Sequence, residues 1–82
     1  MLTLYTRTGC PFCAMVLKKL EEDAIAFEEK NIGDDAVAAE LIEKGGKRQV
    51  PYLIDDARGV AMYESADIVN YLGEHYTNKT AA

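Results

Sequence analysis

The stretch "LTLYTRTGCPFCAMVLKKLEED", residues 2–23, predicts a β-strand that leads directly into an α-helix. Residues 2–6 alternate in polarity and are rich in β-forming side chains, which favours a strand. Pro11 suits the first turn of a helix, because the N–H that proline lacks would have no partner there. Val16, Leu17 and Leu20 then recur at helical spacing, so we expect a helix from Pro11 to about Asp23.

The next segment predicts a second strand and a second helix. Residues 26–31 form a weaker β pattern, and Asp34 is a suitable N-cap for the helix that follows. Gly45 and Gly46 are typical of a helix end. The side chains expected on one side of this helix are Val37, Leu41 and Ile42.

The last segment predicts an antiparallel hairpin and a third helix. "VPYLID", residues 50–55, is a short apolar strand opened by Pro51, and "VAMY", residues 60–63, can pair back onto it. Ser65 is the predicted N-cap of the final helix. The side chains expected on its buried face are Ile68, Val69 and Leu72.

These elements predict an α/β fold with the order β-α-β-α-β-β-α. A right-handed β-α-β unit makes the first two strands parallel, and the hairpin must add to the same sheet to cover its apolar edge. The prediction is therefore a four-stranded mixed sheet with three helices flanking both faces. Residues 1–76 form this single domain, and residues 77–82 are expected to be a flexible tail.

Composition narrows the class of protein. The chain has 82 residues, 49% of them apolar and 28% charged, as expected of one soluble domain. A net charge of -5 without a dense basic cluster argues against nucleic acid as a partner. The longest uncharged stretch, residues 8–17, is far short of the roughly 20 apolar residues that span a membrane. No secretory signal is recognisable, so we expect a cytoplasmic protein. We also expect it to be a monomer.

Both cysteines of the chain lie where the first strand meets the first helix, a usual position for sites in α/β sheets. Cys10 would occupy the N-cap, where unpaired N–H groups and the helix dipole stabilise its thiolate. Cys13, one turn later and more buried, could resolve a mixed disulfide formed on Cys10. Phe12 offers an apolar surface beside the sulfur, and Arg7 adds positive charge.

A metal site and a structural disulfide are the alternatives for this cysteine pair. Zinc usually needs four ligands, and the chain adds only the distant His75 to its two cysteines. A disulfide that closes so short a loop would add little stability. A Cys-X-X-Cys next to a β-α-β pattern therefore favours redox chemistry, with no metal.

"CPFC", followed by "VPYL" at residues 50–53, resembles the glutaredoxins of the thioredoxin-like superfamily. The resemblance implies a glutathione-dependent thiol-disulfide oxidoreductase that acts on glutathionylated or disulfide-containing proteins. Glutathione would be its co-substrate, and no bound cofactor is implied. The resemblance also implies a cis Val50–Pro51 bond. The Val50 backbone would then be free to pair with glutathione, as in strand addition.

The same resemblance implies the other contacts with glutathione. Its glycine carboxylate would meet Arg7 and either Lys47 or Gln49, while the direction of Arg48 stays open. "MYESADIVNYL", residues 62–72, departs from the glutaredoxins and resembles the Glu-Ser element of the amino-terminal domain of glutathione transferases. There Glu64 would pair with the γ-glutamyl amine, and Ser65 with helix N–H groups would accept the carboxylate. Asp67 could assist.

Two other functions remain open at this point. A non-catalytic glutathione-binding domain would have no use for the resolving Cys13. An iron–sulfur carrier would share a cluster between two copies through Cys10 and two glutathione molecules, but cluster-binding members usually have a smaller residue than Pro11. The sequence therefore favours the oxidoreductase.

Overall fold

The structure, a computed structural model, describes residues 2–76, and these form four strands and three helices. The observed order is β-α-β-α-β-β-α, as predicted. The elements are β1 (Leu2–Thr6), α1 (Pro11–Glu22), β2 (Glu28–Asn31), α2 (Asp35–Gly45), β3 (Tyr52–Asp55), β4 (Val60–Met62) and α3 (Ser65–His75). The predicted tail, residues 77–82, lies outside the described residues.

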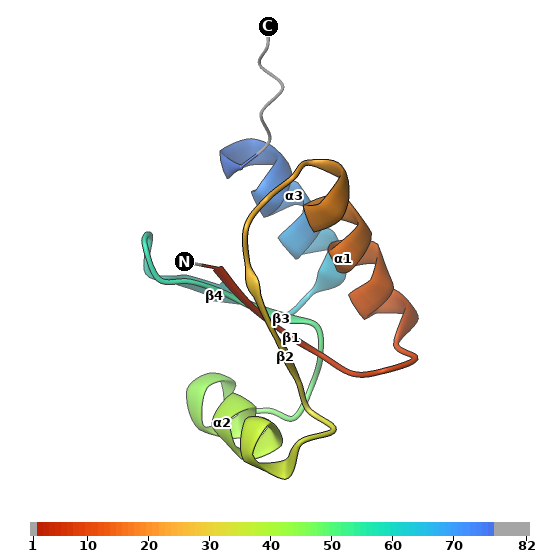
Figure 1. The fold of residues 1–82 in the computed structure, drawn as a ribbon. Coiled ribbons are helices and arrows are strands. Elements are labelled where there is room, and N and C mark those ends of the chain that lie inside the picture. Colours follow the sequence, from red (N-terminus) through yellow and green to blue (C-terminus); the bar gives the residue numbers. More distant parts are fainter. Residues whose placement is uncertain (1, 77–82) are drawn as a thin grey trace, which may run out of the picture.

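The four strands form one mixed sheet in the order β2-β1-β3-β4. β1 runs parallel to β2 and antiparallel to β3, and β4 pairs antiparallel with β3. Helices α1 and α3 lie together on one face of the sheet, and α2 lies on the other (Figure 1). The predicted fold class is therefore confirmed.

The period-two alternation of β1 divides the core between the two faces of the sheet. Leu2 and Leu4 are buried with side chains from α1 and α3, whereas Tyr5 is buried with side chains from α2. The buried residues on the first face are Leu2, Leu4, Val16, Leu20, Leu53, Ile68 and Leu72. Those on the second face are Tyr5, Ile32, Ala38, Leu41 and Tyr52.

Two details of the second strand and second helix differ from the prediction. Strand β2 begins at Glu28, opposite Thr3, instead of at residue 26, and Phe27, just before the strand, packs against the core. Ile42 is 46% exposed, because Ala38 and Leu41, three residues apart, form the side of α2 that faces the sheet. The prediction that Ile42 shares the side of Leu41 was wrong.

The start of α3 is also shifted by one residue. Glu64 is the N-cap, with extended backbone angles and no side-chain capping bond, and Ser65 is the first helical residue. The predicted Ser65 N-cap was therefore wrong. The helix starts earlier because the Ile68 N–H donates to the Glu64 carbonyl at 2.9 Å, which closes the first turn one residue before Ser65 could cap it.

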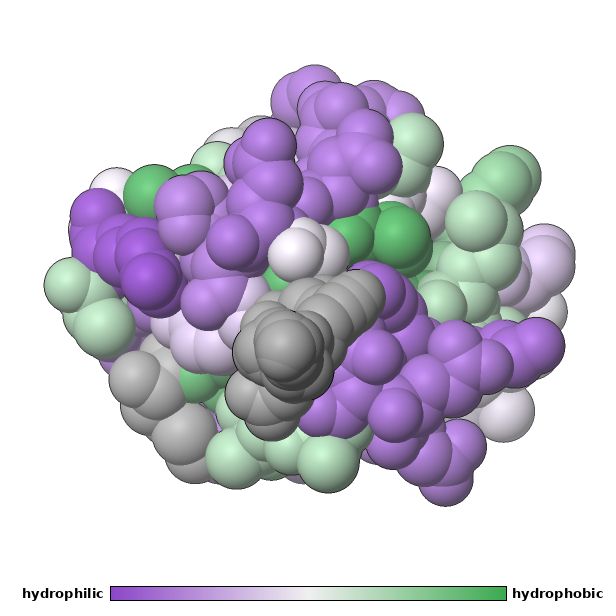
Figure 2. All heavy atoms as spheres, turned by 90° about the horizontal axis from the view of Figure 1, so that it is seen from above, coloured by the Kyte–Doolittle hydropathy of each residue, from purple (hydrophilic) through white to green (hydrophobic). Residues whose placement is uncertain are grey.

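The molecular surface is mainly polar where Figure 2 shows it. Hydrophilic side chains cover most of this face, and hydrophobic ones appear in small, separate patches. None of the helices between residues 2 and 76 is long and apolar enough to cross a membrane.

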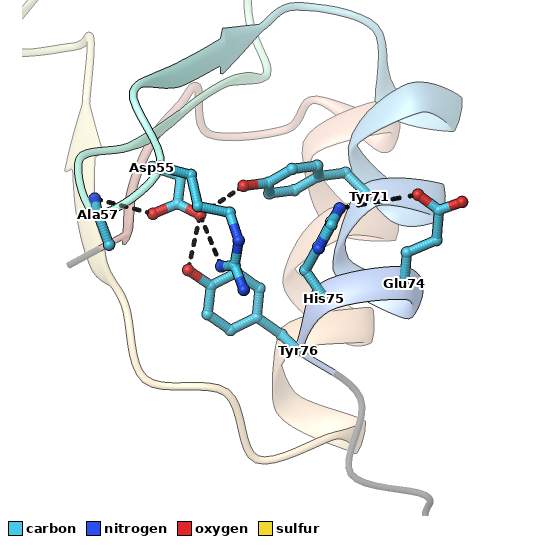
Figure 3. Close-up of polar contacts among 7 residues, drawn as sticks. Asp55, Ala57, Tyr71, Glu74, His75 and Tyr76 are labelled. Atoms are coloured by element: carbon cyan, nitrogen blue, oxygen red, sulfur yellow. Dashed lines mark hydrogen bonds and ion pairs between the residues drawn. The ribbon is translucent and has the colours of Figure 1, made fainter.

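A buried carboxylate fastens α3 to the end of β3 (Figure 3). Asp55 has no exposed surface and accepts hydrogen bonds from the hydroxyls of Tyr71 at 2.5 Å and Tyr76 at 2.6 Å. The Arg58 guanidinium lies 3.3 Å from the same carboxylate oxygen, and the Ala57 N–H donates to the other at 3.1 Å. The sequence did not predict these contacts, because the positions of Tyr71 in α3 and of Tyr76 at its C-cap do not reveal a partner on β3.

The ionised form of Asp55 should stabilise the fold. Burial alone would raise the pKa of this carboxyl, but the hydrogen bonds from Tyr71, Tyr76 and Arg58 outweigh burial and lower the pKa to about 2. A folded-state pKa below the unfolded value adds stability that is present above about pH 4 and is lost as the pH falls toward 2. This contribution is on the order of 2 kcal/mol.

We expect Asp55→Asn to lower the free energy of unfolding at pH 7 by about 3 kcal/mol, because the amide cannot accept from all four donors. The difference from wild type should narrow as the pH is lowered from 5 to 2, in urea unfolding followed by circular dichroism. Asp56→Asn, at the exposed neighbouring position, is the control. If the difference in free energy of unfolding between wild type and Asp55→Asn is the same at every pH in this range, the lowered pKa of Asp55 is contradicted.

Candidate functional site

Cys10 caps the first helix with its own sulfur. The loop after β1 contains Gly9 at a φ of 82°, a backbone conformation that glycine tolerates and most residues do not. The Cys10 N–H then donates to the Arg7 carbonyl at 3.2 Å, and Cys10 itself is extended, at φ -86° and ψ 115°. In this position its sulfur accepts a hydrogen bond from the backbone N–H of Cys13 at 3.3 Å.

The pKa values of the two thiols are shifted in opposite directions. Burial would raise the pKa of Cys10, but hydrogen bonds from the Cys13 thiol and from the backbone N–H groups of Cys13 and Phe12, together with the Arg7 charge, lower it overall. Burial and the hydrogen bond with Cys10 raise the pKa of Cys13 to about 11. Both thiols are free, and Cys10 is 8% exposed whereas Cys13 is 1% exposed. Cys10 is therefore the better nucleophile near neutral pH.

The Val50–Pro51 peptide bond is cis, as the resemblance to glutaredoxins implies. Val50 lines a pocket of about 280 Å³ together with Cys10. Arg7 and Arg48 both line this pocket, so the structure settles the direction of Arg48 that the sequence left open. The full lining is Arg7, Cys10, Pro11, Phe12, Ile32, Arg48 and Val50.

A second pocket, of about 190 Å³, adjoins the first through Phe12 and Val50, which line both. Its remaining lining comes from the loop before β3 and from the turn that leads into α3. These residues are Gln49, Pro51, Tyr63, Glu64 and Ser65. The tertiary structure thus gathers most of the predicted glutathione contacts into one two-part cleft beside the thiols.

Lys47 and Cys13 lie outside this two-part cleft. The Lys47 ammonium lies 5.2 Å from the centre of the Tyr63 ring, and neither pocket of the cleft includes Lys47. Cys13 lines a third pocket, of about 440 Å³, which shares Arg7, Cys10 and Pro11 with the first pocket of the cleft and extends to Leu17 and to Glu29 of β2. Among residues 2–76, no three His, Cys, Asp or Glu side chains gather where they could hold a metal ion.

Tyr63 is a site residue that sequence reasoning missed. It lines the pocket with Glu64 and Ser65, but the sequence alone gave it no role. The available signal was its position immediately before the Glu-Ser pair, which places it at the same turn.

Comparison with known proteins identifies the family. The sequence model described as "Glutathione S-transferase, N-terminal domain" matches residues 4–80. The chain belongs to this family. The predicted resemblance to the transferase amino-terminal domain is therefore confirmed.

Curated relatives of this transferase-type domain are redox proteins. The glutaredoxin-like protein NrdH of Lactococcus lactis subsp. lactis is 38% identical over 56 residues, which cover 68% of this chain and 78% of the relative. Glutaredoxin 3 of Escherichia coli K12 is 31% identical over 58 residues, 70% of each chain. The hybrid peroxiredoxin hyPrx5 of Haemophilus influenzae is 34% identical over 50 residues, 61% of this chain but 21% of that protein. The glutaredoxin resemblance is thus also confirmed, and the chain is related to thiol-disulfide oxidoreductases.

Solved structures support the transferase-type fold. An epsilon-class glutathione S-transferase from housefly, Musca domestica, has a TM-score of 0.78 and 26% identity, covering 95% of this chain. A glutathione S-transferase from the Antarctic clam Laternula elliptica has a TM-score of 0.77 and 32% identity, covering 92% of this chain. The domain spans 36% and 35% of the lengths of these two transferase chains.

The assigned acidities predict how the cysteines react with an alkylating agent. The rate of alkylation of Cys10 by iodoacetamide should rise with pH with a midpoint below the ordinary thiol value of about 8.5. Cys13→Ala should move this midpoint upward because it removes the thiol donor, whereas Cys13→Ser keeps a donor and should move it less. Mass spectrometry would follow the modified residue.

The Cys10→Ser variant is the control for this experiment. It should react slowly at neutral pH, because the remaining Cys13 is buried and has a pKa of about 11. A wild-type midpoint at or above 8.5 would contradict the assignment of Cys10 as the acidic thiol.

Proposed function

We propose that this chain is a glutathione-dependent thiol-disulfide oxidoreductase with Cys10 as its nucleophile. The observation that carries the proposal is the Cys10 sulfur at the start of α1, with a lowered pKa and with Cys13 one helical turn behind it. The adjoining two-part cleft supports glutathione as the co-substrate. The relationship to glutaredoxin 3 and to NrdH supports the reaction class.

The first step is an exchange of one sulfur–sulfur bond for another. The Cys10 thiolate attacks the glutathione sulfur of a glutathionylated protein, and the bond to the protein sulfur breaks. The protein leaves as a thiolate that takes a proton from solvent. Cys10 and glutathione are then joined by a disulfide, and the protein has been reduced.

Two routes can return Cys10 to its thiolate. In the monothiol route a second glutathione thiolate attacks the glutathione on Cys10, so oxidised glutathione leaves and Cys10 is released. In the dithiol route Cys13 attacks the Cys10 sulfur, glutathione leaves as a thiolate, and two further glutathione molecules reduce the Cys10–Cys13 disulfide. The hydrogen bond that the Cys13 thiol donates to Cys10 raises the pKa of Cys13, and it is lost once Cys10 is in a disulfide, so Cys13 then ionises more easily.

The charges along the cleft suit the two ends of glutathione. Arg7 and Gln49, with Arg48 or Lys47, would bind the glycine carboxylate, and the Val50 backbone would pair with the cysteinyl unit. At the other end Glu64 would pair with the γ-glutamyl amine. Ser65, at the start of α3, would bind the neighbouring carboxylate with the aid of helix N–H groups.

The proposal needs glutathione as reductant and no resident cofactor. The substrates would be glutathionylated or disulfide-containing proteins. The protein would act as a monomer. A reducing compartment such as the cytoplasm would keep the glutathione pool reduced.

We expect Cys10→Ser to lower the rate of deglutathionylation by at least about a hundredfold, because the nucleophile is lost. The assay would follow reduction of a glutathionylated peptide with glutathione as the sole reductant. Cys13→Ser distinguishes the routes, since retained activity selects the monothiol route and loss selects the dithiol route. A Cys10→Ser variant with wild-type activity would refute the proposal, as would wild-type protein that binds glutathione but catalyses no exchange.

We expect Glu64→Gln to raise the KM for glutathione about tenfold, because one charge-assisted hydrogen bond to the amine is lost. The kcat should change little, since Glu64 does not contact the sulfurs. Glu74→Gln, at the other end of the same helix, is the matched control. Equal KM values for the two variants would show that Glu64 does not bind the amine.

A further inference from the structure

The two-part cleft is assembled from segments that are distant in the sequence. Gln49 and Val50 come from the loop between α2 and β3, and Glu64 and Ser65 come from the turn between β4 and α3. A ligand that contacts both segments requires a constant separation between them. The strength of glutathione binding should therefore depend on whatever ties the loop to the turn.

The loop has few attachments of its own. Among residues 2–76, no backbone-to-backbone hydrogen bond is made by residues 47–50. The Tyr63 hydroxyl replaces such bonds, because it accepts from the Lys47 N–H at 3.1 Å and donates to the Lys47 carbonyl at 3.1 Å. One side chain from the turn thus satisfies both polar groups of one loop residue.

The Tyr63 ring is itself held in place. Its centre lies 4.4 Å from the centre of the Tyr52 ring, and the Lys47 ammonium lies 5.2 Å from it. Gly45 makes the close approach of the hydroxyl possible. A Cβ atom on Gly45 would lie 2.1 Å from the Tyr63 hydroxyl oxygen and 3.1 Å from the Tyr52 ring.

We propose that Tyr63 is a positioning residue that ties the loop of residues 46–50 to the Glu64–Ser65 turn, so that both segments bind one glutathione molecule at once. The proposal rests on the proposed function for its ligand. Tyr63 acts through the Lys47 backbone, and Gly45 is part of the same device because only glycine leaves room for the hydroxyl.

The decisive variant is Tyr63→Phe, which keeps the ring and removes both hydrogen bonds. We expect the KM for glutathione to rise about fivefold, because part of the binding energy must now order the loop. The kcat and the pH midpoint of Cys10 alkylation should stay within about twofold and about 0.2 units of wild type, since Tyr63 does not contact the thiols. Tyr52→Phe is the matched control, because the Tyr52 hydroxyl makes only a 3.5 Å contact with the Lys44 carbonyl.

Hydrogen exchange of the Lys47 amide gives a second readout that does not depend on activity. Exchange should be at least about tenfold faster in Tyr63→Phe than in Tyr52→Phe, because the acceptor is lost. Gly45→Ala should reproduce both the faster exchange and the higher KM by displacing Tyr63. Gly73→Ala, whose added Cβ would meet only the Lys19 ammonium at 3.9 Å, should change neither.

Two results would overturn the positioning role. An unchanged KM in Tyr63→Phe would do so, whether or not the Lys47 amide exchanges faster. A Lys47 amide that exchanges at the wild-type rate in Tyr63→Phe would show that the tie does not hold the loop. Failure of the proposed function is recognised separately, before any variant is compared, because wild-type protein would then show either no glutathione binding in a titration or no exchange activity in the assay.

Discussion

The hydrogen bond from the Cys13 backbone N–H to the Cys10 sulfur is the interaction on which the site depends. At 3.3 Å it makes the sulfur the cap of α1, so the group that stabilises the helix start is also the group that we propose as the nucleophile. The capping donors and the helix dipole both favour a negative sulfur. The same local geometry therefore serves folding and chemistry.

Burial and capping act in opposite directions on this sulfur. Burial of Cys10 raises its pKa, and this is the largest single effect. The pKa is lowered overall only because the donors at Cys13 and Phe12, with the Arg7 charge, act together against it. Cys13 is buried deeply and its thiol donates to Cys10, so its pKa rises. One turn of helix thus holds one thiol with a lowered pKa, Cys10, and one with a raised pKa, Cys13.

The cleft beside the thiols is built at the end of the sheet where β1 passes into α1. Val50, in the loop before β3, lines the cleft together with Cys10, and Glu64 and Ser65 line it from the turn after β4. At the far end of β3, Asp55 holds α3 against the sheet through Tyr71 and Tyr76. The helix that begins at the cleft is therefore anchored at its opposite end.

Local periodicity and the turn and cap residues were enough to predict the order of elements, the fold class and the positions of Cys10 and Cys13 relative to α1. The prediction was wrong where the fold did not follow a local rule, as at the start of α3, where Ser65 is the favoured N-cap residue but Glu64 occupies the N-cap without a side-chain capping bond. The exposed Ile42 was missed because periodicity does not show which edge of an apolar stripe meets the sheet.

Contacts between groups that are distant in the sequence depend on how the whole domain packs. Arg48 faces the pocket next to Cys10, and Lys47 lies against the Tyr63 ring, although the two cations are adjacent in the sequence. The hydroxyls of Tyr63 and Tyr71 find partners on other elements, at the Lys47 backbone and at Asp55. A long side chain can reach several elements, and packing of the whole domain selects one of them, so no local pattern could reveal these contacts.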